Sequence, residues 1–124
     1  MPTRDLTHDD FAEVASGDGI VFVDFWAAWC GPCRAFAPTF ERAAETHPDI
    51  VFAKVDTEAE QQLAAAFRIT SIPTLMVFRD GIRLYAQPGA VSGPQLELLV
   101  QSARDLDMDE VRRQLAAHEA RSAS

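Results

Sequence analysis

The chain has two cysteines, Cys30 and Cys33, separated only by a glycine and a proline. Pro32 suits the first turn of a helix, so we expect Cys30 at a helix N-terminus and Cys33 one turn further on. There the helix dipole and unpaired backbone N–H groups stabilise a thiolate, the reactive form of cysteine. The spacing also brings the sulfurs close enough for a disulfide bond. The motif predicts redox chemistry, with Cys30 as the exposed nucleophile and Cys33 as the shielded resolving thiol.

Other uses of a cysteine pair fit this sequence less well. A structural zinc site needs four ligands, and His8, His47 and His118 supply no second pair at zinc-finger spacing. A purely structural disulfide is unexpected in a reducing cytosol, and unreactive core cysteines are unexpected between a strand and a helix. We therefore expect a redox-active disulfide between Cys30 and Cys33, with no metal and no bound cofactor.

Asp24 is the second residue that could do chemistry. It interrupts the apolar run Phe-Val-Asp-Phe-Trp, six residues before Cys30. Burial should raise the pKa of this carboxyl, because an unpaired charge is costly in an apolar environment. Two interpretations remain open: Asp24 accepts the proton of Cys33, or it is a structural residue bonded to the backbone or to Lys54, the only lysine. We favour the proton acceptor, because perturbed carboxyls cluster at functional sites.

Two tryptophans flank the approach to Cys30. Trp29 directly precedes the cysteine on a loop, and we expect it on an exposed docking surface. We assign Trp26 to core packing. The Ile72-Pro73 bond precedes a strand, and on sequence alone such a bond is most often an ordinary trans turn.

The apolar periodicity predicts nine elements in the order α-β-α-β-α-β-β-α-α. The expected strands are residues 20–26, 50–56, 75–79 and 82–86. The expected helices begin near Thr7, Pro32, Thr57, Ser92 and Asp107. Thr57 and Glu60 have capping-box spacing, as do Ser92 and Gln95.

These elements predict an α/β fold. The first two strands and the helix between them form a right-handed parallel βαβ unit. Asp80-Gly81 between the last two strands is a strong hairpin signal. The result is a mixed central sheet of four to five strands with helices on both faces.

Composition excludes several classes of partner. The chain has 124 residues, which suits one domain, and a net charge of −8, which disfavours binding to nucleic acid or to an anionic membrane. No apolar run is long enough for a membrane span, and the first residues have no secretory pattern. We expect a cytoplasmic monomer.

A longer series of motifs resembles the thioredoxin family. It runs from Asp24 through Trp29-Cys30-Gly31-Pro32-Cys33 and continues with Pro38, Ile72-Pro73-Thr74, Asp80-Gly81 and Gly89-Ala90. The series keeps its order and register over about residues 6–104. Two residues depart from the common pattern: Arg34 stands where lysine is common, and Pro88 stands where many members carry valine.

The resemblance implies a thioredoxin fold and a set of site residues. Asp24, Cys30 and Cys33 would be catalytic, with Asp24 buried beside Cys33 and supported by Lys54 and Trp26. Pro73 would be cis and pack against the disulfide. Substrate peptides would lie on a surface formed by Trp29, Gly31, Pro32, Ile72, Pro73, Gly89 and Ala90.

The resemblance also implies a function, that of a cytosolic protein-disulfide reductase. An NADPH-dependent thioredoxin reductase would reduce the chain again after each turnover. Two alternatives remain: a binding or chaperone module of the same fold whose redox activity is secondary, and an oxidase or isomerase. The Gly-Pro dipeptide favours the reductant.

The last twenty residues extend beyond the usual length of the family. We expect a thioredoxin domain over residues 1–104 and a helical extension over 105–124. Met108, Val111 and Leu115 share one face of the expected helix. We expect that face to pack on the same domain, and the alternative is a partner-binding arm.

Overall fold

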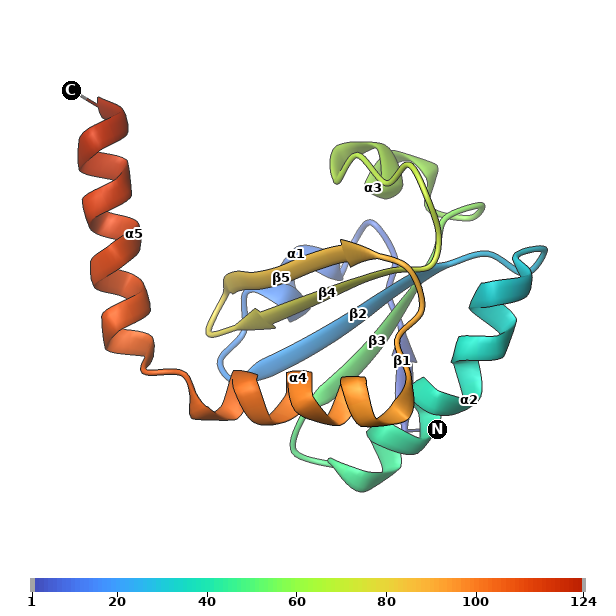
Figure 1. Cartoon of the computed structure of the whole chain (residues 1–124). Helices are drawn as coiled ribbons and strands as arrows, with labels where there is room; N and C mark the ends of the chain where they lie inside the picture. The colour runs from blue at the N-terminus through green and yellow to red at the C-terminus, as the bar shows by residue number, and fades with distance from the viewer. Residues whose placement is uncertain (1, 124) are drawn as a thin grey trace.

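The computed structural model describes residues 2–123, and its centre is a five-stranded mixed sheet (Figure 1). The spatial order of the strands is β1-β3-β2-β4-β5. They are β1 (Thr3–Asp5), β2 (Ile20–Trp26), β3 (Val51–Asp56), β4 (Thr74–Arg79) and β5 (Ile82–Pro88). β1, β3 and β2 are mutually parallel, whereas β4 runs antiparallel to both β2 and β5.

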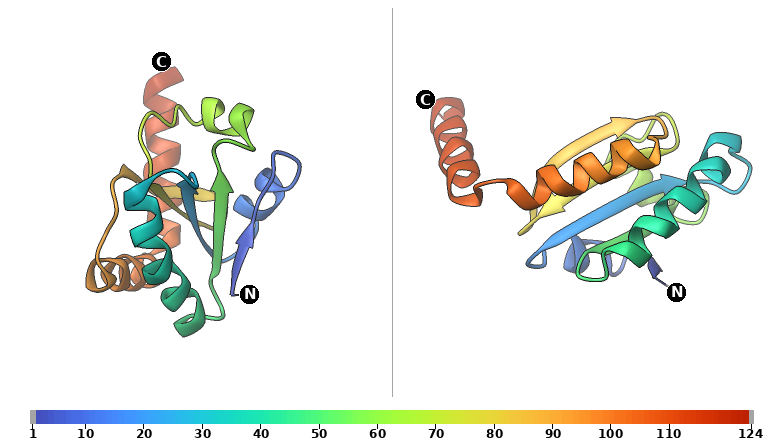
Figure 2. Two further views of the ribbon diagram at one scale, coloured as in Figure 1. Left: turned by 90° about the vertical axis from the view of Figure 1, so that its right-hand side faces the viewer. Right: turned by 60° about the horizontal axis from the view of Figure 1, so that its bottom comes forward.

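Helices cover both faces of the sheet (Figures 1 and 2). They are α1 (Phe11–Ala15), α2 (Gly31–Thr46), α3 (Gln61–Ala66), α4 (Gly93–Asp105) and α5 (Met108–Ala123). α2 and α4 pack on one face around Phe22, Phe40 and Phe52. α1 and α3 pack on the other face around Phe11, Phe25 and other apolar side chains. Because the central strands are buried on both faces, they appear in the sequence as continuous apolar runs. The predicted α/β fold is confirmed.

One strand is not predicted by the sequence, and one predicted helix cap does not form. β1 was not predicted, because three largely exposed residues carry no periodic signal. The capping box expected at Thr57 and Glu60 does not form, and α3 begins only at Gln61. Tertiary contacts use both side chains instead: the Thr57 hydroxyl donates to the Trp26 carbonyl at 3.0 Å, and Glu60 accepts from the His8 amide at 2.6 Å.

α4 is fixed at both of its ends. Ser92 and Gln95 form the predicted capping box at its N-terminus. At its C-terminus the Arg79 guanidinium donates to three carbonyl oxygens, those of Ala103, Arg104 and Leu106, at 2.8, 3.2 and 2.9 Å. Arg79 thus satisfies carbonyl groups that the helix leaves without an internal partner, and it links β4 to α4.

α5 projects away from the sheet (Figure 1). Met108 is buried and Val111 is partly buried, but Leu115 is 39% exposed. Arg112 adds an ion pair to Asp80 in the β4–β5 turn at 3.3 Å. The sequence predicts that the face formed by Met108, Val111 and Leu115 packs on the domain. In the structure, the described part of α5 contacts the domain only through its first turns. This apolar stripe is too short to pack the remaining turns of α5 against the domain. None of the described helices is long and apolar enough to cross a membrane.

Candidate active site

The two cysteines lie where β2 leads into α2 and are joined by a disulfide bond, with their Cα atoms 5.2 Å apart. Cys30 is the N-cap residue of α2, in an extended conformation, and its sulfur accepts a hydrogen bond from the Cys33 amide at 3.2 Å. Pro32 occupies the first turn, as its fixed φ angle favours. The N-terminal end of a 16-residue helix therefore faces the sulfur of Cys30.

The expected difference in exposure between the cysteines is small. Cys30 is 4% exposed and Cys33 is 2% exposed, so the whole-residue exposure does not mark Cys30 as the open nucleophile. Their positions do differ, because Cys30 caps the helix beside exposed Gly31 and Pro32, whereas Cys33 lies inside the first turn.

Asp24 lies in the middle of β2, on the face of the sheet that α2 covers. It is 1% exposed, and neither carboxylate oxygen has a hydrogen-bond partner among the described residues. Lys54 is its register neighbour on β3. Burial raises the pKa of Asp24 to about 7, and the positive charge of Lys54 opposes part of that rise. Among the residues that the structure describes, neither a backbone group nor Lys54 donates a hydrogen bond to this carboxyl.

Lys54 and Trp26 flank the buried carboxyl as a pair. The Lys54 ammonium lies over the Trp26 ring, 4.6 Å from its centroid. Trp26 is only partly buried, and its side chain packs against the cluster of Cys30, Cys33 and Ala27. Its indole nitrogen is buried without a hydrogen-bond partner among the described residues. Trp26 therefore joins the disulfide to the Asp24–Lys54 pair, beyond the core-packing role expected from the sequence.

The Ile72–Pro73 peptide bond is cis, as the family resemblance implies. Ile72 packs against the disulfide, and its carbonyl oxygen lies 3.7 Å from the Cys30 sulfur. The Gly89 amide donates to the Pro73 carbonyl at 2.8 Å, which ties the segment after β5 to this loop. Gly89 has a φ of 103°, which favours glycine at this position.

Trp29 is 68% exposed beside Cys30. Its indole N–H donates to the Glu58 carboxylate at 2.6 Å. Sequence reasoning missed Glu58, because nothing in its spacing signals a contact with a residue on another loop. We call the residues that the family resemblance assigns to substrate binding the docking surface. Its residues are Trp29, Gly31, Pro32, Ile72, Pro73, Gly89 and Ala90.

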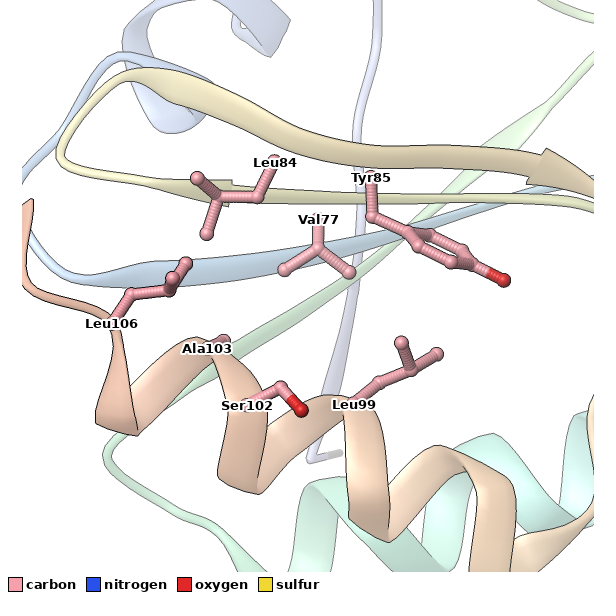
Figure 3. Close-up of a pocket in the computed structure, with 7 residues that line it drawn as sticks. All are labelled: Val77, Leu84, Tyr85, Leu99, Ser102, Ala103 and Leu106. Carbon is pink, nitrogen blue, oxygen red and sulfur yellow. The ribbon is translucent and has the colours of Figure 1, made fainter. Parts of the chain in front are cut away.

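An apolar pocket of about 150 Å³ lies elsewhere, between the β4–β5 hairpin and α4 (Figure 3). Its lining is Val77, Leu84, Tyr85, Leu99, Ser102, Ala103 and Leu106. None of these residues belongs to the disulfide cluster or to the docking surface. Among the described residues, no group of three or more His, Cys, Asp or Glu side chains is placed to hold a metal ion.

The arrangement can exchange disulfides. A cysteine at a helix N-terminus can attack as a thiolate, and the second sulfur lies within bonding distance to displace a product. A buried carboxyl with a pKa near neutrality can hold or accept the proton that moves in this exchange.

Comparisons with known proteins agree with this chemistry. The thioredoxin family model matches residues 2–102. A protein described as putative thioredoxin 2 from Streptomyces coelicolor is 49% identical over 120 residues, which cover 97% of this chain and 90% of that protein. A thioredoxin from Mycoplasma genitalium is 47% identical over 82 residues, which cover 66% of this chain and 80% of that protein.

Comparison with solved structures also finds thioredoxins. A thioredoxin variant from Halobacterium salinarum aligns with a TM-score of 0.77 at 32% sequence identity. The alignment covers 84% of this chain and 92% of the other.

Proposed function

This chain belongs to the thioredoxin family of thiol–disulfide oxidoreductases, and on that premise we propose that it is a protein-disulfide reductase. The observation that carries the proposal is the Cys30–Cys33 disulfide at the N-terminus of α2, preceded in β2 by the buried carboxyl of Asp24, which has no hydrogen-bond partner among the described residues. The cysteine pair carries two electrons, so the reaction needs no bound cofactor.

The reaction proceeds in two exchanges. The Cys30 thiolate attacks a substrate disulfide, forms a mixed disulfide and releases the first substrate thiolate. Asp24 accepts the proton of the Cys33 thiol, and the resulting thiolate attacks the Cys30 sulfur. That attack closes the Cys30–Cys33 disulfide and releases the second substrate thiolate. Two electrons pass from the dithiol to the substrate.

Asp24 suits the role of base because its pKa of about 7 lies near the working pH. Lys54 stabilises the ionised carboxylate, and Trp26 holds Lys54 in position. Substrate segments lie on the docking surface, where the Ile72 backbone beside the Cys30 sulfur can pair with an extended peptide.

We infer the remaining partners from the family and from charge. Proteins with accessible disulfides are the substrates, and an NADPH-dependent thioredoxin reductase returns two electrons to the oxidised chain. The chain works as a monomer in the cytoplasm, where such a reductant is supplied. Its net charge of −8 supports a function without nucleic acid or membrane.

The test is a coupled assay with thioredoxin reductase, NADPH and a disulfide-bonded protein. The wild-type chain should support NADPH oxidation that depends on both the reductase and the substrate. The Cys30→Ser variant is the matched control and should support none. A wild-type chain that binds the substrate protein but consumes no NADPH would favour the binding or chaperone module.

A further inference from the structure

A groove of about 170 Å³ with a mixed polar and apolar lining opens between the end of α3, the start of β4 and β5. Arg68 and Arg83 line it together with the hydroxyl-bearing residues Thr70, Ser71 and Thr74. No Asp or Glu stands among the described residues of its wall. In a chain with a net charge of −8, this groove is a local concentration of positive charge.

The two arginine side chains of this groove have no partner in the part of the chain that the structure describes. Other arginines pair with carboxylates, as Arg104 does with Asp49 at 2.7 Å, or cap a helix, as Arg79 does, although Arg34 and Arg42 also have no side-chain partner among the described residues. Neither the Arg68 nor the Arg83 side chain forms an ion pair or hydrogen bond with any residue that the structure describes. Both residues are exposed, so their guanidinium groups are open to an external anion.

Arg68 also occupies a backbone position that favours glycine. The Arg68 amide donates to the Ala65 carbonyl and the Ile69 amide donates to the Ala64 carbonyl, both at 3.0 Å. These two bonds close α3 in the helix-ending turn whose left-handed residue is usually glycine. Here that residue is Arg68, with a φ of 54°. The backbone conformation alone would favour glycine here, which is consistent with a role for the arginine side chain.

The groove continues the docking surface. Ser71 in the groove directly precedes Ile72, whose carbonyl oxygen lies 3.7 Å from the Cys30 sulfur. Pro88 in the groove directly precedes Gly89, which is bonded to Pro73. An extended substrate segment on the docking surface can run toward the groove, so that a side chain close in sequence to the attacked cysteine faces it.

We propose that the Arg68–Arg83 groove binds the carboxylate of an acidic side chain in the substrate protein, close in sequence to the cysteine that Cys30 attacks. Guanidinium groups bind carboxylates through paired, charge-assisted hydrogen bonds, and the Thr70 and Ser71 hydroxyls can add further donors. The Thr74 hydroxyl already donates to the Ser71 carbonyl at 2.6 Å. This inference rests on the proposed reductase function and names one determinant of its substrate preference.

The test uses disulfide-linked peptides that differ at one residue, three positions from the attacked cysteine. That residue is Glu, Gln or Lys, and the reduced chain reacts with each peptide at low and at high salt. We expect kcat/KM for the Glu peptide to exceed that for the Lys peptide by about tenfold at low salt, as two exposed ion pairs allow. High salt should reduce the ratio.

Two variants that each remove one charge, together with one control variant, test whether Arg68 and Arg83 bind the acidic side chain of the substrate. Arg68→Gly and Arg83→Gln should each lower the Glu-to-Lys ratio by about threefold, with the Gln peptide reduced at the wild-type rate. Glycine adopts the left-handed conformation of residue 68 more readily than arginine, so we expect Arg68→Gly to keep the fold. Arg42→Gln, on an exposed arginine late in α2, makes the same charge change and should leave the ratio unchanged.

Three results would contradict the proposal. A wild-type ratio near one, or a ratio that survives in the Arg68→Gly/Arg83→Gln double variant, would overturn the groove and leave the reductase function intact. Failure of the wild-type chain to reduce any of the peptides, the Gln peptide included, would overturn the proposed function and this inference with it.

Discussion

Asp24→Asn is the change that separates the chemistry of the buried carboxyl from its effect on stability. The substitution keeps the shape of the side chain and removes the titrating group. Asp24 is 1% exposed, its oxygens have no partner among the described residues, and burial raises its pKa from 3.8 to about 7. The folded protein therefore holds a proton on Asp24 over a pH range in which the unfolded chain has released it.

This difference makes the wild-type protein less stable as the pH rises. Between about pH 4 and pH 7 the folded state binds more protons than the unfolded state, so the free energy of unfolding falls through this window. Each pH unit is worth about 1.4 kcal/mol, so the full loss above pH 7 is about 4 kcal/mol. Asparagine at this site still buries an unpaired amide, so we expect Asp24→Asn to gain about 2 kcal/mol at pH 8 and little at pH 4.

Denaturant unfolding of both proteins at pH 4 and pH 8 measures this effect. The free energy of unfolding should fall between these values in the wild type by more than in the variant. The rate at which Cys33 resolves the mixed disulfide should fall in the variant near pH 7, because the proton acceptor is gone. Equal pH dependence of stability in the two proteins would refute the buried-acid argument, and an unchanged resolution rate would reduce Asp24 to a structural residue.

Three further predictions concern other parts of the molecule. Cys33→Ser should accumulate a mixed disulfide through Cys30 that mass spectrometry detects, whereas Cys30→Ser should accumulate none; an adduct found on Cys33 would reverse the roles. Arg79→Met should lower the free energy of unfolding by about 2 kcal/mol, because three carbonyl groups at the end of α4 lose a charged donor. Arg83→Met should change it little, because the Arg83 side chain has no partner among the described residues. Removal of residues 107–124 should lower Tm by a few degrees, because Met108 and the Arg112–Asp80 pair are lost, and should leave disulfide reduction near the wild-type rate; a loss of coupling to the reductase without a loss of stability would instead identify α5 as a docking arm.

The sequence predicted the sheet and its helices because their signals are local and strong. Runs such as residues 20–26 are typical of strands covered on both sides, and Asp80-Gly81 favours the hairpin between β4 and β5. β1 escaped prediction because three mostly exposed residues become a strand only by pairing with β3. The sequence predicted the length of α5. The direction in which α5 leaves the domain depends on tertiary contacts made by its first turns.

Only part of the site could be predicted, because motifs identify some of its residues whereas others meet only through tertiary contacts. The cysteine pair, Asp24 and the cis proline could be proposed from a motif and a family resemblance. The Trp29–Glu58 hydrogen bond could not, because the residues are 29 positions apart and their contact depends on how two loops meet. Arg68 and Arg83 likewise come together only when α3 ends beside β5. Their spacing in the sequence carries no sign of a shared groove.

A single-turnover reaction tests the central claim most directly. The fully reduced chain is mixed with one equivalent of a disulfide-bonded protein, without reductase or NADPH, and the thiols on both partners are counted after an acid quench. We expect two thiols to appear on the substrate for each chain that closes its Cys30–Cys33 disulfide. A substrate that stays oxidised beside a chain that keeps both of its thiols would contradict the account.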